Sequence, residues 1–167
     1  MITASRRVTL LVAAVVATGC STASPEPSVA PAPPSQQALE AYEQYWLISS
    51  AAFQAPAAQD WTSALAQVAS GSALDSVLLD VRNYAAYPAH TEGGVSRSPQ
   101  VVRTSPTDVE IVDCVDLGDS RLVADDTGEL LEDLSNRRQR YTFRATVALQ
   151  TDTWRVDRTE PLLDQPC

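Results

Sequence analysis

The chain contains no lysine, and it has few of the other residues on which catalytic and metal sites usually depend. Its 167 residues include one histidine, three cysteines and one methionine, and only 6% of them are aromatic. No cysteine pair has C-x-x-C spacing, so a zinc site lacks its usual ligands. A glycine-rich phosphate loop and a serine nucleophile elbow are also missing. The sequence therefore contains no catalytic constellation, and we predict no cofactor and no metal.

Positive charge is scarce as well, because every base is an arginine and the formal net charge is −9. Loss of residues 1–19, predicted below, would leave ten Arg against 21 Asp plus Glu, a formal charge of −11. Phosphate backbones repel such a domain, so nucleic acid is excluded as an expected partner. A run of acids between Asp113 and Glu129 raises the alternative of calcium, but it lacks the D-x-D-x-D-G loop that wraps that ion.

The amino end has the layout of an export signal. Arg6 and Arg7 precede an apolar run over residues 8–17, and the small residues Thr18 and Gly19 follow it. A run of about ten residues is half of the ~20 that a helix needs to cross a bilayer. We therefore predict that residues 1–19 are a cleaved signal peptide.

The four residues from Ala17 to Cys20 resemble the lipobox of bacterial lipoproteins, in which the cysteine is lipidated and becomes the first mature residue. The sequence departs from that pattern at Ala17, where the family prefers leucine, and an ordinary secreted protein is the alternative. Residues 20–35 are rich in Pro, Ala and Ser, a composition typical of a flexible tether. We expect an exported protein that lipidated Cys20 anchors to the outer face of the cell membrane.

Residues 36–167 are enough for one folded domain with a single core. If Cys20 carries lipid, Cys114 and Cys167 remain as a pair, and in an oxidising compartment such a pair indicates a disulfide. Two free thiols or a metal site are the alternatives.

Helical periodicity dominates the first half of this domain. Ser35, Asp60 and Ser72 are candidate N-caps, each followed by apolar residues at helical spacing. The predicted helices span residues 36–53, 61–69 and 73–87.

The apolar period changes to two after Pro99, which predicts strands. The predicted strands span residues 100–104, 109–117, 120–124, 140–150 and 154–158. The turn residues 105–108 join the first two into a hairpin. Residues 88–98, which include His90 and two glycines, are predicted to form a surface loop with the histidine facing solvent. Helices followed by strands predict an α+β domain with three helices on one face of a curved antiparallel sheet.

Three short motifs carry a resemblance to a known superfamily. They are the strand Val112-Asp113-Cys114-Val115-Asp116, a late W-x-V at residues 154–156, and the cysteine at position 167. With the order of elements, residues 36–167 resemble the nuclear-transport-factor-2-like (SnoaL-like) superfamily and its small bacterial lipoproteins. The resemblance implies a cone-shaped domain, supports the disulfide and allows a homodimer through the sheets. It implies no activity, because this fold hosts isomerases, cyclases, dehydratases and plain binding domains.

A pocket inside the cone is the one candidate binding site. Its candidate residues are Tyr42, Trp46, Asp113, Phe143 and Trp154. Strand alternation places Asp113 on the face of Val109, Ile111 and Val115, where a carboxylate could act as a general base. We favour the alternative that Asp113 turns outward or pairs with an arginine of residues 140–150. For the aromatic residues we favour a role in filling the core.

Arg137, Arg138, Arg140 and Arg144 could meet an anionic partner, but pairing with neighbouring acids is the favoured interpretation.

The expected function follows from these points. The leading hypothesis is a lipid-anchored cell-envelope protein with a non-catalytic domain that binds a small apolar ligand or another envelope protein. The first alternative is a small lyase or isomerase that acts on an apolar ligand in the cone, with Asp113 as its base. The second is a structural accessory subunit of an envelope complex.

Overall fold

Three helices come first in the part of the chain that the structure describes, residues 31–167 of a computed structural model. They are α1 (Pro34–Gln54), α2 (Thr62–Val68) and α3 (Gly71–Ala86). The prediction of three helices in this order is confirmed, with ends that differ by one or two residues. The predicted signal peptide and Cys20 lie outside the described residues.

The helix starts differ from the prediction for a simple reason. Helix α1 begins at Pro34, so Ser35 lies inside the helix and does not cap it. Proline is favoured in a first helical turn because the amide hydrogen that it lacks would have no partner there. Before α2, the carboxylate of Asp60 accepts from the Thr62 amide at 2.9 Å, although the N-cap position itself is occupied by Trp61. Ser72 lies inside α3, whose N-cap is Ser70, so it does not cap that helix.

Four strands form the main sheet, in the order β2-β3-β5-β6, and all of its neighbours are antiparallel. Their bounds are Gln100–Thr104, Asp108–Asp116, Arg140–Gln150 and Thr153–Leu162. The predicted hairpin at residues 105–108 is confirmed, and so is the 140–150 strand. Strand β6 runs four residues beyond its predicted end. Positive φ angles of 46° and 65° at Thr151 and Asp152 make the tight turn between β5 and β6.

A second, two-stranded sheet joins β4 (Arg121–Ala124), which the sequence predicted as the 120–124 strand, to β1 (Ala89–Glu92), which it did not predict. The predicted loop at residues 88–98 therefore contains a strand. His90 is consequently half-buried, and its Nδ1 lies 2.7 Å from Oδ1 of Asp125. A strand as short as β1 carries little periodicity, so it was missed, and it pairs with β4 across a separation of about thirty residues in sequence.

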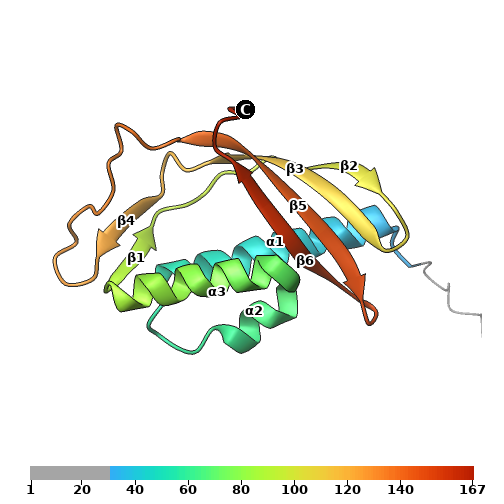
Figure 1. Cartoon of the computed structure of the whole chain (residues 1–167), viewed down its shortest axis with the longest axis horizontal. Coiled ribbons are helices and arrows are strands. Elements are labelled where there is room, and N and C mark those ends of the chain that lie inside the picture. The colour runs from blue at the N-terminus through green and yellow to red at the C-terminus, as the bar shows by residue number, and fades with distance from the viewer. Residues whose placement is uncertain (1–30) are drawn as a thin grey trace, which may run out of the picture. The chain divides into compact units, whose positions relative to one another are not determined.

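The core lies between the helices and one face of the main sheet (Figure 1). Along β3 buried and half-buried residues alternate, so that Val109, Ile111, Asp113 and Val115 point to the helices. The opposite face of the sheet carries the residues between them. This confirms an α+β fold with three helices followed by a curved antiparallel sheet.

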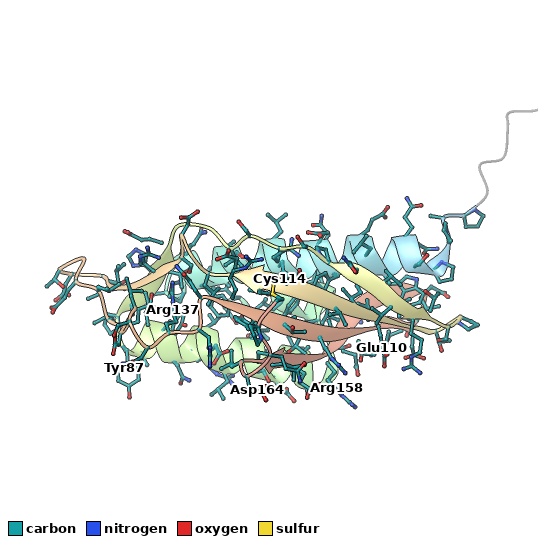
Figure 2. The ribbon with its side chains drawn as sticks, turned by 90° about the horizontal axis from the view of Figure 1, so that it is seen from above. Tyr87, Glu110, Cys114, Arg137, Arg158 and Asp164 are labelled. Carbon is teal, nitrogen blue, oxygen red and sulfur yellow. A yellow bond between two sulfur atoms is a disulfide. The ribbon has the colours of Figure 1, made fainter. Side chains whose placement is uncertain are left out.

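Cys114 and Cys167 form a disulfide, and their Cα atoms are 5.6 Å apart. The bond attaches the chain's last residue to the face of β3 that points away from the helices (Figure 2). No helix within residues 31–167 is long and apolar enough to cross a membrane.

Candidate functional site

Four of the five candidate pocket residues come together between α1 and the sheet. Trp46 lies edge-on to Phe143 of β5, with ring centroids 5.3 Å apart, and to Tyr42, at 6.3 Å. The Tyr42 hydroxyl donates to Oδ2 of Asp113 at 2.9 Å. Trp154 is buried in the same core, but it takes no part in the aromatic contacts that join these rings within residues 31–167.

Asp113 faces the core, and the favoured prediction that it turns outward or pairs with an arginine of β5 is wrong. The residue is 1% exposed. Strands β3 and β5 pair without a register shift from Asp108 to Asp116, so no bulge rotates the side chain outward. Arg140 of β5 instead contacts Asp116, which points to the other face, at 3.5 Å.

Three groups from two parts of the chain, helix α1 and the segment between β1 and β2, hold the Asp113 carboxylate. Besides Tyr42, the Ser98 amide donates to Oδ1 at 2.6 Å. Nη1 of Arg97 lies 3.8 Å from Oδ2, which makes an ion pair. A buried carboxylate needs such partners, because desolvation without them costs several kcal/mol.

Arg97 is the site residue that the sequence did not reveal. Its guanidinium carbon lies 5.6 Å from the Tyr42 ring centroid and 5.2 Å from that of Trp46, both within cation–π range. Its Nη2 also forms an ion pair with Glu43, which lies between Tyr42 and Trp46 in the sequence of α1. The arginine lies in the irregular segment between β1 and β2, where periodicity gives no signal.

Burial sets the protonation behaviour of this cluster. It raises the pKa of Tyr42 far above the usual tyrosine value, and the negative charge of Asp113 adds to the effect, so the phenol stays a donor. Burial also raises the pKa of Asp113, although the hydrogen bonds from Ser98 and Tyr42 and the charge of Arg97 work against that rise. The only fully buried carboxylate of the described core, Asp113, is thus held by Tyr42, Ser98 and Arg97. The cluster is not fully satisfied, because Nη1 of Arg97 and Nε1 of Trp46 are buried without a hydrogen-bond partner within residues 31–167.

The other side of the sheet carries a hollow of about 390 Å³. Its charged lining is balanced, with Arg144 and Arg158 against Glu110 and Glu160. Strand pairing places Arg144 opposite Glu160, and Arg103 forms an ion pair with Glu110 at 2.5 Å. Val102 and Val112 add apolar surface between these charges. We call this surface the outer sheet face.

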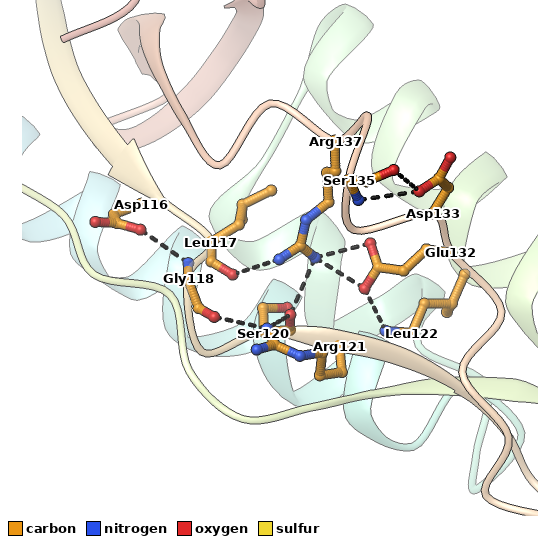
Figure 3. Close-up of polar contacts among 10 residues, drawn as sticks. All are labelled: Asp116, Leu117, Gly118, Ser120, Arg121, Leu122, Glu132, Asp133, Ser135 and Arg137. Carbon is orange, nitrogen blue, oxygen red and sulfur yellow. Dashed lines mark hydrogen bonds and ion pairs between the residues drawn. The ribbon is translucent and has the colours of Figure 1, made fainter.

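Arg137 fastens the long connection between β4 and β5 (Figure 3). Its Nη1 donates to both carboxylate oxygens of Glu132, at 2.8 and 2.7 Å, and its Nη2 donates to the Leu117 carbonyl at 2.8 Å. The Ser120 carbonyl accepts a further hydrogen bond at 3.0 Å. Arg137 and Arg140 thus pair with neighbouring acids, as predicted. Within residues 31–167 no group of three or more His, Cys, Asp or Glu side chains is arranged to hold a metal ion.

The class that these observations define is an α+β domain whose three helices cover one face of an antiparallel sheet, with a core of buried side chains between them. No protein-family model matches the chain, and no curated protein matches it. Among solved structures, the intermembrane space region of the chloroplast protein ARC6 has a TM-score of 0.59 at 16% identity, covering 79% of this chain and 98% of that one. At this identity the likeness shows a shared fold alone.

Two further structures match at a TM-score of 0.41. One is a de novo designed β-sheet protein, 17% identical, with 75% of this chain and 89% of that one covered. The other is an ntf2-like protein with a cystatin-like fold from Novosphingobium aromaticivorans, 14% identical, with 76% and 80% covered.

Proposed function

We propose that this chain is an exported, lipid-anchored protein whose folded domain is a non-catalytic binding or interaction module. The location follows from the export signal and the lipobox pattern that ends at Cys20. The role of the domain is supported by one observation, which is that buried and aromatic side chains pack between α1 and the sheet. An enzyme of the lyase or isomerase type would need an open cavity beside its base.

Asp113 does not suit the role of such a base. A general base has to reach its substrate within hydrogen-bond distance, and this carboxylate is already held by Tyr42, Ser98 and Arg97. The outer sheet face is the better surface for a partner, because it is hollowed and has both charges and apolar patches available. A protein of the cell envelope, or a second copy of the chain, is the class of partner that we propose.

Native mass spectrometry of the purified chain, with and without an extract of the source cell's envelope, tests this role. Arg158→Glu on the outer sheet face should abolish any specific complex or dimer, and Arg82→Glu, on the exposed side of α3, is the matched control. A complex that both variants keep would contradict the assignment of this face. A small apolar molecule that stays bound would favour the enzyme hypothesis instead.

Lipidation has its own test. Cys20→Ser should move the protein from the detergent phase to the aqueous phase in a partitioning experiment, because the acyl chains supply the membrane affinity. A substitution at Ser21 serves as control. Partitioning that Cys20→Ser leaves unchanged would remove the anchor from the proposal.

A further inference from the structure

Arg97 lies in a box of side chains that has the chemistry of a cation-binding site. Two aromatic rings, from Tyr42 and Trp46, lie within 5.6 and 5.2 Å of its guanidinium carbon. Two carboxylates, Asp113 and Glu43, pair with its nitrogens. Aromatic faces combined with carboxylates are what proteins use to bind guanidinium and alkylammonium groups. We call Tyr42, Glu43, Trp46 and Asp113 the cation box.

The cation box and Arg97 lie in different kinds of structure. Helix α1 and strand β3 supply all four box residues, and both elements contribute to the main core. Arg97 comes from the segment between β1 and β2, outside any helix or strand. Two backbone hydrogen bonds between Ser96 and Asp116, at 3.0 and 2.9 Å, and the Ser98 amide on Asp113 hold this segment near the arginine.

The fit of the arginine to the box is incomplete. Its side chain remains 17% exposed, while that of Asp113 is fully buried. Nη1 is buried, yet it makes no hydrogen bond to any residue in the 31–167 range, because Asp113 is 3.8 Å away. A free cation with the same head group could approach the carboxylate more closely, since no backbone would restrain it.

We propose that the cation box is a binding site for an alkylguanidinium cation, and that the chain fills this site with its own Arg97. Emptying the box would leave a buried carboxylate without a counter-charge, a costly state that a soluble cation relieves. In the wild-type chain the tethered arginine competes at an effective concentration on the order of millimolar, so an external cation enters only when residues 93–99 withdraw. The segment acts as an internal ligand.

This inference goes beyond the proposed function and is independent of it. The cation box lies on the helix side of the sheet, whereas the proposed partner surface is the outer sheet face. A complex lost on Arg158→Glu would leave the cation box untouched, and failure of the cation box would leave the outer sheet face as a candidate interface.

Chemical rescue of Arg97→Ala tests the site in the purified full chain. Ethylguanidinium chloride should raise the Tm of this variant in a saturable manner, because a ligand of the folded state shifts the folding equilibrium about tenfold once it reaches about ten times its Kd. Ethylurea, a neutral analogue, and sodium chloride at equal concentration should not. Arg103→Ala, which removes an exposed arginine of β2, is the matched variant and should show no rescue.

The double variant Arg97→Ala/Asp113→Asn identifies the site. It should lose the response to ethylguanidinium, because the buried carboxylate is gone. If Arg97→Ala does not fold by itself, ethylguanidinium should restore its near-ultraviolet circular dichroism, and ethylurea should fail to do so. Absence of any specific response in Arg97→Ala, or an equal response in the double variant, would overturn the proposal.

Discussion

The phenolic hydroxyl of Tyr42 donates to the carboxylate of Asp113 at 2.9 Å, across 71 positions of sequence. This hydrogen bond joins α1 to β3 inside the core, where both residues are at most 1% exposed. Buried polar pairs of this kind stabilise one arrangement of the elements, because every alternative leaves a polar group without a partner.

Tyr42→Phe should therefore destabilise the domain by about 1–2 kcal/mol, the cost of leaving a buried acceptor with one donor fewer. Urea unfolding followed by circular dichroism measures the change. Tyr87→Phe is the control, because Tyr87 is 78% exposed and its loss should cost nothing measurable. Equal midpoints for the two variants would mean that the Tyr42 bond contributes no net stability.

The raised pKa of Asp113 should make the free energy of unfolding depend on pH. Because burial raises its pKa, the folded chain keeps this proton at pH values where the unfolded chain, with a carboxyl pKa of about 3.9, has released it. This contribution is fully present below the unfolded pKa and is lost as the pH rises through the folded pKa. The free energy of unfolding of the wild type, relative to Asp113→Asn, should thus fall as the pH rises above about 4.

Urea titrations of both proteins at several pH values measure that difference. Asp75→Asn, on the exposed side of α3, corrects for the simple loss of one negative charge. A difference that stays constant or grows with pH would show that the ion pair with Arg97 outweighs burial.

Loss of the disulfide should weaken the domain considerably. The Cys114–Cys167 bond closes a loop with a sequence separation of 53, for which the chain-entropy estimate is about 4 kcal/mol. The double variant Cys114→Ser/Cys167→Ser should unfold at a lower urea concentration than the wild type, and a reductant should move the wild type to the same midpoint. A wild-type midpoint that does not respond to reductant, with free thiols confirmed by alkylation, would contradict this prediction.

Arg137 should control the local stability of the connection between β4 and β5. Arg137→Ala removes the hydrogen bonds to Glu132, Ser120 and Leu117, so amide hydrogen exchange over residues 125–139 should become faster. Arg138→Ala removes the exposed neighbour and is the matched control. Exchange rates that rise equally in both variants would exclude a specific role for Arg137.

Much of this fold could be predicted from local patterns. Alternation along residues 109–115 placed Asp113 on the face of the sheet that carries the core, and the 140–150 strand was predicted with its observed ends. Such patterns are reliable because a strand exposes its side chains with period two, whatever the rest of the chain does. The interpretation that Asp113 nevertheless turns outward was wrong, because it did not consider that Arg97, from the segment between β1 and β2, could supply a positive charge inside the core.

The sequence by itself determined the three helices and the four strands of the main sheet in their order, the pairing partner available to Cys114, and the export and lipidation pattern that we propose. Only the tertiary structure decided that β1 pairs with β4, that Arg97 reaches Asp113, and that buried side chains pack between α1 and the sheet. The physical reason is that periodicity records which side of an element is buried. Which distant side chain contacts that buried side depends on the path of the whole chain. Residues 93–99, which carry Arg97, form no helix or strand, so periodicity does not predict their path.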